Sequence, residues 1–356
     1  MLIKLMLISG LVISLSQAEA NGILESWKGF SDPEIMASGF THKLKELPLE
    51  GSIDIGPKAW SGHYWPSQEG GINVRWYHPD KEGFKYKSPT KEQVKLMSLN
   101  ELAALAPTEK YDLFTGHYDY PMKELAATAA SRLAPDWAGI CHGWAPATLN
   151  HNEPTPKVMT NPDGVKIPFG SSDIKALLSY YYAFHHETKG SHQLGLRCFF
   201  GRWMGGAKAC QEDLNAGAFH IVISNMLGLR REGFMADVDR YKEVWNQPIV
   251  AFKSKIVADQ LAPSKGAAES AVKEMKIETD FFYVDEVDNV TWDVVHGTKD
   301  QLIAKRTYSY NLEINASGNI VGGSWDSDER PDFLWNKEKA TTFNGILSLL
   351  PQLLND

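Results

Sequence analysis

A single cysteine, Cys141, stands in a sequence context typical of a catalytic nucleophile. It lies in the segment Trp-Ala-Gly-Ile-Cys-His-Gly-Trp-Ala, with one glycine two residues before it and another two residues after it. The residues that follow, 145–150, favour a helix that begins close to the cysteine. A helix N-terminus lowers the pKa of a thiol and offers unpaired N–H groups to an oxyanion. We therefore predict that Cys141 is a nucleophile, although the motif alone fits a buried structural cysteine equally well.

His220 and two aspartates are the candidates for activating this cysteine. His220 lies in the apolar run Phe-His-Ile-Val-Ile-Ser, which we expect to form a buried strand, and Asp237 and Asp239 follow on the next expected strand. A base for a cysteine must lie within hydrogen-bond reach of it and be oriented by a third group. Both aspartates share one face of the strand, so alternation cannot choose between them. Taken alone, His220 is more often a core histidine, but the chain order Cys, His, Asp favours a catalytic triad.

The remaining two cysteines predict a disulfide in an exported protein. Residues 1–20 combine a positively charged start, an apolar stretch and a small-residue ending, which is the pattern of a secretory signal cleaved after Ala20. Three cysteines leave one thiol unpaired, and Cys198 and Cys210 flank a glycine-rich stretch able to close into a hairpin. We therefore expect a Cys198–Cys210 disulfide, a free Cys141, and a secreted or periplasmic location.

Charge and hydropathy exclude several classes of partner. The chain has a net charge of −8 and therefore lacks the basic surface that nucleic-acid binding requires. After the signal, no segment of the sequence is long and apolar enough to span a bilayer. With 43% hydrophobic residues the chain can bury a large core, and its 11 Trp and 13 Tyr suit either that core or a groove for extended substrates.

The elements expected around these residues predict an α+β fold. Helical periodicity marks residues 91–106, 119–133, 171–187 and 341–350, and strand-like patterns mark 216–228, 233–239, 244–257, 278–295 and 306–325. Because Cys, His and Asp occur in the order found in papain-like proteases and transglutaminases, we expect a core of that type. In it, a helix carrying the cysteine packs on an antiparallel sheet carrying the histidine and aspartate.

Four segments describe the expected organisation of the chain. The signal peptide comprises residues 1–20, and an aromatic, glycine-rich segment, 21–95, wraps the core. Residues 96–260 form the catalytic core, and 261–356 form a β-rich C-terminal segment.

An acidic cluster occurs in the last third of the sequence. Its members are Asp285, Glu286, Asp288 and Asp293. Carboxylate oxygens can hold a divalent cation, but a solvated acidic face is the better explanation, and no EF-hand loop occurs. The sequence requires no cofactor, and it assigns no metal ligand.

The segment Val-Trp-Asn-Gln-Pro, residues 244–248, resembles a surface peptide of the oomycete transglutaminase elicitors, which plants recognise as a pathogen signature. The resemblance extends over most of the mature chain. It includes Trp-Ser-Gly-His-Tyr-Trp-Pro, Gly-Ile-Cys-His-Gly-Trp-Ala, Gly-Asn-Ile-Val-Gly-Gly-Ser-Trp and Pro-Asp-Phe-Leu-Trp. Ile249, Val250 and Ala251 depart from the usual pattern, so recognition by plants is not carried over.

This resemblance implies a protein-glutamine γ-glutamyltransferase. Cys141, helped by His220, attacks the side-chain amide of a glutamine, ammonia leaves, and a thioester forms. A lysine or a small primary amine then attacks, so the implied partners are proteins with exposed Gln and Lys. A tryptophan-lined approach favours amine over water by excluding solvent; the candidates for that lining are Trp60, Trp65, Trp137 and Trp144. A divalent cation, Ca²⁺ or Mn²⁺, is compatible with the resemblance.

Two other functions use the same sequence features. A papain-like cysteine peptidase has the same residues but attacks a main-chain amide. Such peptidases place a glutamine several residues before the cysteine. None occurs in Leu-Ala-Pro-Asp-Trp-Ala-Gly-Ile-Cys, which argues against a peptidase. A catalytically silent elicitor or adhesion protein is the third reading, and the intact Cys, His and Asp set argues against it.

Overall fold

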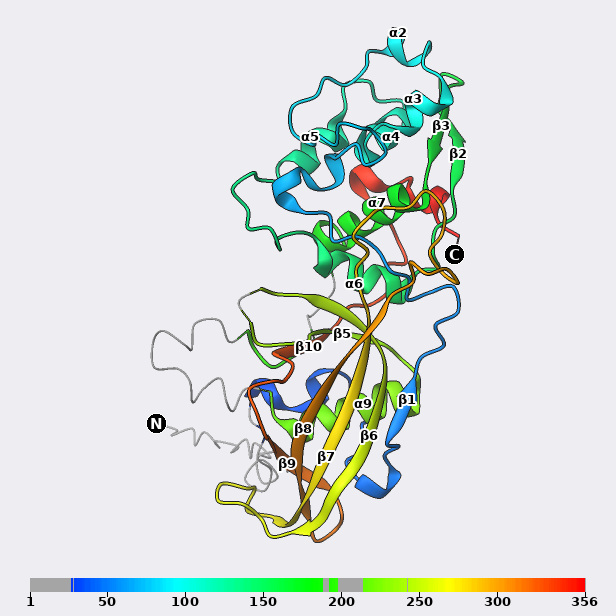
Figure 1. The fold of residues 1–356 in the computed structure, drawn as a ribbon. Coiled ribbons are helices and arrows are strands. Elements are labelled where there is room, and N and C mark those ends of the chain that lie inside the picture. Colours follow the sequence, from blue (N-terminus) through cyan, green and yellow to red (C-terminus); the bar gives the residue numbers. More distant parts are fainter. Residues whose placement is uncertain (1–26, 28, 188–191, 198–213, 242, 356) are drawn as a thin grey trace, which may run out of the picture.

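A computed structural model describes residues 27, 29–187, 192–197, 214–241 and 243–355. The described chain forms an elongated molecule with a helical half and a sheet half (Figure 1). The signal-peptide region and the proposed Cys198–Cys210 disulfide lie outside the described residues, so both stay predictions. Among the described residues, no helix combines the length and apolar content needed to cross a membrane.

The helical half contains six α-helices and a small hairpin among its described residues. The helices are α2 (Lys91–Val94), α3 (Leu99–Ala103), α4 (Pro107–Phe114), α5 (Pro121–Ala127), α6 (Cys141–Asn150) and α7 (Ser171–Phe184), and the hairpin pairs β2 (Lys157–Thr160) with β3 (Lys166–Phe169). The predicted helix over 91–106 is interrupted, because Ser98 caps a second helix with a reciprocal bond to Glu101. The predicted helices over 119–133 and 171–187 form, although the first ends at Ala127.

The sheet half is built on an antiparallel sheet in the order β4-β10-β5-β6-β7-β8-β9, with β1 also pairing with β6. Its strands are β1 (Glu50–Ser52), β4 (His192–Leu194), β5 (Phe234–Asp237), β6 (Asn246–Leu261), β7 (Ala271–Val284), β8 (Ile303–Asn315), β9 (Ile320–Trp325) and β10 (Phe333–Asn336). The β8–β9 turn has the predicted chemistry, because the Asn315 side chain accepts from the backbone of Ser317 and Asn319. The segment boundary expected between residues 260 and 261 falls within β6, and strands before and after it belong to this one sheet.

The segment 216–228 is helical, so the strand predicted there is wrong. Residues Ala216–Ile223 form α9, which continues as a π-helical turn over Ser224–Arg230. Asn215 caps α9 by accepting hydrogen bonds from the backbone of Gly217 and Ala218. A continuous apolar run does not distinguish a buried strand from a helix that is buried all round. The cap selects the helix.

The remaining elements are short 3₁₀ turns. They are Gly29–Ser31, Pro33–Ile35, Leu44–Glu46, Ser67–Glu69, Gly71–Asn73, Gly345–Leu347 and Leu350–Leu353. The last two replace the C-terminal α-helix expected over 341–350, because Gly345 in the middle of that segment has φ +60°, which a right-handed α-helix does not allow.

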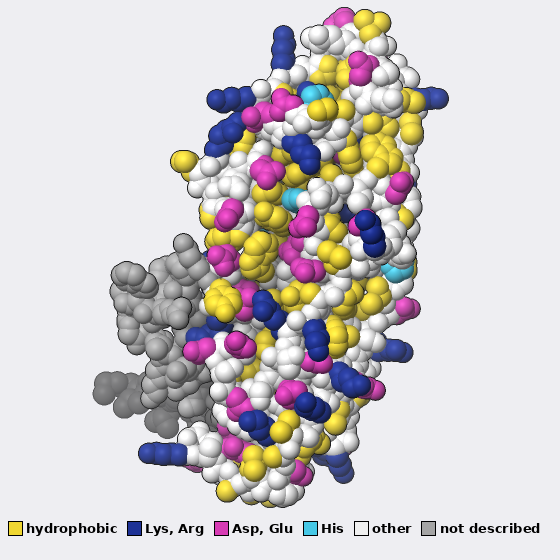
Figure 2. Space-filling model, viewed as in Figure 1, with side chains coloured by type: hydrophobic (Ala, Val, Ile, Leu, Met, Phe, Trp, Pro, Cys, Tyr) yellow, Lys and Arg dark blue, Asp and Glu magenta, His cyan; other side chains and the backbone are white. Residues whose placement is uncertain are grey.

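Two hydrophobic cores lie on opposite faces of the central strands. The first joins the helical half to one face of the sheet and includes Trp144, Met235 and Val250. The second fills the space between α9 and the other face and includes Phe219 and Phe281. On the solvent side of β6, β7 and β8, acidic and basic side chains intermingle (Figure 2), with ion pairs such as Lys255–Glu278 and Lys305–Asp280.

Candidate active site

Cys141 is the first residue of α6, which confirms the helix predicted to begin at the cysteine. The glycines on either side of Cys141 let the backbone of other segments approach the start of α6 closely. A Cβ at Gly139 would lie 2.3 Å from the carbonyl oxygen of Tyr64, and a Cβ at Gly143 would lie 2.1 Å from that of Ser179 on α7. Only glycine permits both approaches. The glycine pair thus fixes α6 between the N-terminal segment and α7.

The Cys141 sulfur contacts the residues that open β6. Its Sγ lies 3.7 Å from the carbonyl oxygen of Val244 and 3.6 Å from the Nδ2 of Asn246, which donates to it. The Asn246 amide is itself oriented, because Trp335 Nε1 donates to its Oδ1 at 2.9 Å. Asn246 therefore presents its NH₂ group to the sulfur.

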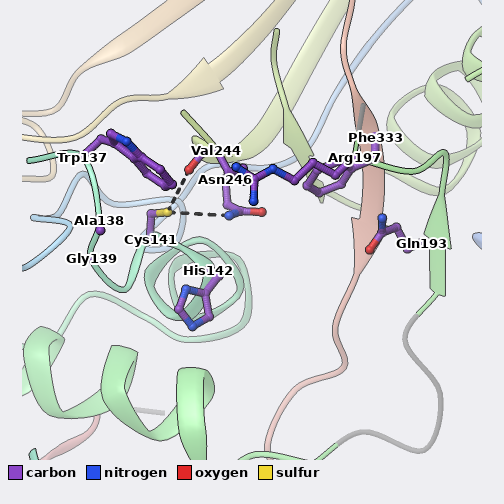
Figure 3. Close-up of a pocket in the computed structure, with 10 residues that line it drawn as sticks. All are labelled: Trp137, Ala138, Gly139, Cys141, His142, Gln193, Arg197, Val244, Asn246 and Phe333. Atoms are coloured by element: carbon purple, nitrogen blue, oxygen red, sulfur yellow. Dashed lines mark hydrogen bonds between the residues drawn. The ribbon is translucent and has the colours of Figure 1, made fainter. Parts of the chain in front are cut away.

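A pocket of about 350 Å³ opens beside the sulfur. Figure 3 shows its lining, which comprises Trp137, Ala138, Gly139, Cys141, His142, Gln193, Arg197, Val244, Asn246 and Phe333. The indole of Trp137 lies next to the sulfur, whereas the imidazole of His142 points away from it. A side chain entering the pocket therefore meets the thiol between an indole and a carboxamide.

Burial raises the pKa of the Cys141 thiol to about 11, and hydrogen bonds from Asn246 oppose that rise. The negative charges of Glu286 and Asp237 add to the rise, which places both carboxyl groups within electrostatic range of the sulfur. Cys141 is consequently a neutral thiol at pH 7, and it needs a proton acceptor before it can attack.

Asp237 lies on the sheet face that carries the site. It pairs directly with Asn246 on β6 and with Phe333 on β10, and both of these residues line the pocket. Directly paired residues of an antiparallel sheet project from the same face. The structure therefore places Asp237 on the sheet face whose residues Asn246 and Phe333 line the Cys141 pocket. Asp239 lies beyond the end of β5, where its carboxylate pairs with Arg306 at 3.2 Å.

His220 is not brought to the cysteine. Its Nδ1 bonds to the Tyr310 hydroxyl at 2.8 Å, that hydroxyl bonds to Thr279, and Thr279 bonds to Ser254. Ser254 is eight residues beyond Asn246 on β6, a separation of roughly 25 Å along an extended strand. The expected relay from Cys141 through His220 to an aspartate is therefore not formed, because α9 places the imidazole in the second core.

Replacing His220 with alanine is expected to destabilise the protein and to leave the chemistry of Cys141 unchanged. The imidazole is fully buried, and burial lowers its pKa to about 4, so a neutral polar group with one strong hydrogen bond is lost. We expect the free energy of unfolding to fall by about 2–3 kcal/mol. Thermal unfolding and the rate of Cys141 alkylation by iodoacetamide measure the two effects. Slower alkylation at an unchanged thermal midpoint would restore His220 as the base.

Of the four tryptophans expected to line the approach, only Trp137 does so. Trp60, Trp65 and Trp144 are at most 1% exposed and belong to the first core. The Trp60 indole bonds to the His151 carbonyl oxygen, and Gly62 packs against the Trp144 ring. Their prediction as substrate-binding residues is therefore wrong for this structure, because their rings fill the interior between α6 and the N-terminal segment.

The acidic cluster does not gather into a metal site in this structure. Among the described residues, no group of three or more His, Cys, Asp or Glu side chains is arranged to hold a metal ion. Glu286 instead accepts a hydrogen bond from Gln247 Nε2 at 2.8 Å. Burial raises the pKa of Glu286 to about 8.

The segment 244–248, expected at the surface, forms one wall of the site. Val244 and Asn246 contact the sulfur, Gln247 binds Glu286, and the Trp245 ring packs edge-on against Tyr64 at 5.5 Å between centroids. Asn246, Gln247 and Pro248 are buried. The stretch most specific to the resemblance is therefore also the stretch that holds the cysteine.

A family model described as transglutaminase elicitor matches residues 123–348, which contain both Cys141 and the segment 244–248. The chain belongs to the transglutaminase elicitor family. A crystal structure of the GP42 transglutaminase from Phytophthora sojae has a similar fold, with a TM-score of 0.64 and 23% sequence identity. The match covers 90% of this chain and 94% of that chain. No curated protein matches the sequence significantly.

Sequence reasoning missed two residues of this transglutaminase-elicitor site, Asn246 and Trp335. Both lie in motifs that carried the resemblance, Val-Trp-Asn-Gln-Pro and Pro-Asp-Phe-Leu-Trp. Asn246 opens the strand that follows Asp237 and Asp239, and this order was a signal for a polar group on the same sheet face. The contact with the sulfur depends on pairing β5, β6 and β10, which a local pattern does not determine.

Proposed function

We propose that this protein is a transglutaminase that forms γ-glutamyl isopeptide bonds through a thioester on Cys141. One observation carries the proposal: the only cysteine among the described residues begins a helix, lines a pocket, and receives a hydrogen bond from an oriented carboxamide. Membership of the transglutaminase elicitor family supports the same reaction class.

In the proposed reaction the sulfur attacks the glutamine carboxamide carbon. The first N–H groups of α6 and the Asn246 amide are suited to stabilise the negative oxygen of the tetrahedral intermediate. Ammonia then leaves, and the acyl group stays on Cys141 as a thioester. A primary amine completes the transfer, whereas water yields glutamate.

The test is to incubate the protein with casein and a fluorescent primary amine. We expect covalent fluorescence on casein, release of ammonia, and γ-glutamyl-amine peptides in mass spectra. Cleavage of casein without amine incorporation would instead establish a cysteine peptidase. Neither product in the presence or absence of Ca²⁺ or Mn²⁺ would favour a silent elicitor or adhesion protein. Export forms part of the proposal, and N-terminal sequencing of the protein from culture medium tests cleavage after Ala20.

Trp137 is expected to control the competition between amine and water. Its half-buried indole lines the pocket next to the sulfur, so its removal opens the thioester to solvent. We expect Trp137→Ala to raise the ratio of glutamate formed to amine incorporated by about three- to tenfold, a change worth about 1 kcal/mol. The control is Leu133→Ala, which removes a side chain 94% exposed and outside the pocket. An unchanged ratio would contradict the solvent-shielding role.

A further inference from the structure

The described residues leave the buried Cys141 thiol without a histidine to accept its proton. His220 lies in the second core, and the imidazole of the adjacent His142 points away from the sulfur (Figure 3). The acceptor must therefore be another group near the sulfur. Two carboxyl groups, those of Asp237 and Glu286, are close enough to influence the thiol electrostatically.

Asp237 differs from Glu286 in its hydrogen bonding. Glu286, in the segment after β7, accepts a hydrogen bond at Oε2 from Gln247 of β6, and only its Oε1 has no partner among the described residues. Neither oxygen of Asp237 accepts a hydrogen bond of good geometry from the described residues, although the backbone N–H groups of Trp245 and Asp239 lie close enough to favour its charged form. Asp237 is 1% exposed. A buried carboxyl group with uncommitted oxygens is costly to fold, which argues for a use.

The position of Asp237 directs those oxygens toward the site. It is the middle residue of a row across three strands, Phe333–Asp237–Asn246, and its two neighbours in the row both line the Cys141 pocket. The next residues on the same face, Met235 and Trp335, belong to or pack against the first core, beneath the helices. The whole row therefore faces α6, which carries the cysteine.

We propose that Asp237 is the proton acceptor for the Cys141 thiol and the proton donor to the leaving ammonia. This inference rests on the proposed transglutaminase function. It gives to a strand-borne aspartate, next to the Asn246 that contacts the sulfur, the role that the sequence assigned to a histidine.

The proton balance of the reaction closes on this one carboxyl group. The S–H proton passes to the Asp237 carboxylate, directly or through one water, as the C–S bond forms at the glutamine amide. When the intermediate collapses, the C–N bond breaks and the same proton leaves on ammonia. In the second half, the attacking amine gives its proton to Asp237, the C–S bond breaks, and that proton returns to the sulfur.

The surroundings of Asp237 bring its proton affinity closer to that of the thiol. Burial, followed by the charges of Asp332 and Asp239, raises the pKa of Asp237 to about 9. A carboxylate with this pKa is a far stronger base than an exposed one and approaches the thiol pKa of about 11. The titratable and charged groups described near it are Cys141, Asp239, Tyr308 and Asp332, together with Glu286, which acts on the same thiol, and the Arg197 guanidinium, which lines the same pocket.

The pH dependence follows from the direction of this shift. Below pH 9 the Asp237 carboxyl is mostly protonated and unable to accept a proton, so activity limited by this base should rise about tenfold per pH unit from pH 6 to 8 and level off near pH 9. Asp239→Asn is the matched comparison, because Asp239 lies two residues further on and is ion-paired with Arg306 outside the pocket. Because the charge of Asp239 contributes to the raised pKa of Asp237, this variant should keep the rate at the plateau and move the rise to lower pH.

The experiment compares Asp237→Asn with the wild-type protein in two assays. We expect kcat/KM for amine incorporation to fall about 100-fold or more, the range for losing a positioned base. Alkylation of Cys141 by iodoacetamide at pH 9 should be as fast or faster, because removing a neighbouring negative charge lowers the thiol pKa. Lost turnover with a thiol that remains reactive is a signature that a structural role does not give.

Three outcomes decide the matter. Turnover within threefold of wild type in Asp237→Asn overturns the proposal and leaves the transglutaminase function standing. Loss of both turnover and alkylation, together with a lower thermal midpoint, overturns it in favour of a structural role for Asp237. Absence of amine incorporation by the wild-type protein refutes the proposed function instead. Asp237→Glu adds a check, because restored carboxylate chemistry should recover part of the rate and the pH dependence.

Discussion

Replacing Cys141 with alanine is expected to abolish amine incorporation into casein and to leave the protein folded. The thioester cannot form without the sulfur, so we expect the rate to fall by roughly 10⁴-fold or more, as for the loss of other catalytic nucleophiles. The stability cost should be small. The substitution removes one atom from a residue that is 4% exposed, and the two polar contacts of that atom are long, at 3.6 and 3.7 Å.

Cys141→Ser provides the matched control for this substitution. Serine keeps a polar group for Asn246 and Val244 but is a much weaker nucleophile, so both variants should be inactive while unfolding within a few degrees of the wild-type protein. Amine incorporation is followed by fluorescence on casein, and folding by circular dichroism during heating. Turnover by Cys141→Ala above a few per cent of wild type would remove Cys141 from the mechanism altogether.

The local sequence was sufficient to predict the helix that begins at Cys141. Two glycines around Cys141 and a helix-forming stretch after it are short-range signals, and the structure explains both glycines by backbone contacts closer than any Cβ permits. Strands β5 and β6 were also predictable, because β-branched and aromatic residues follow clear turn signals there. These features depend on neighbours within a few residues.

The error at His220 has a definite physical origin. The run Ala216–Ile223 has no polar side chain apart from His220 itself, and such a run fits a buried strand and a fully buried helix equally well. Asn215 decides between them by capping α9, and once the run is helical the imidazole packs against Tyr310. Asn215 was visible in the sequence as a possible helix cap. The sequence does not show whether that cap outweighs the strand propensity of the residues that follow it.

The choice between the aspartates could not be made from the sequence because it depends on where β5 ends. Asp237 is the last residue of the strand and pairs with Asn246, whereas Asp239 lies past the end and reaches Arg306 on β8. The tryptophans show the same limit. Trp60, Trp65 and Trp144 share composition and context with Trp137, and only the packing of α6 determines which ring stays beside the pocket.

Asn246→Ala is expected to produce the second largest loss of activity. The Asn246 amide donates to the resting sulfur, and in the reaction it is placed to donate to the developing negative charge. Removing one such donor lowers kcat by about 100- to 1,000-fold. The backbone N–H and the side chain of Asn246 both oppose the burial effect on Cys141, and only the side-chain bond is lost in this variant, so the thiol pKa should rise and alkylation should move to higher pH. The measurements are kcat for amine incorporation and the pH dependence of iodoacetamide labelling.

Trp335→Phe separates the donor role of Asn246 from its packing. Phenylalanine keeps most of the ring but removes the Nε1–H that holds the Asn246 Oδ1 at 2.9 Å. The amide remains present but is free to turn, so we expect a loss of about three- to tenfold, equivalent to one ordinary hydrogen bond. Asn311→Ala is the control, because its amide binds Asp326 on the surface of β8. If Asn246→Ala and Trp335→Phe were equally mild, the carboxamide would serve only to fill space beside the cysteine, and stabilisation of the intermediate would fall to the backbone of α6 alone.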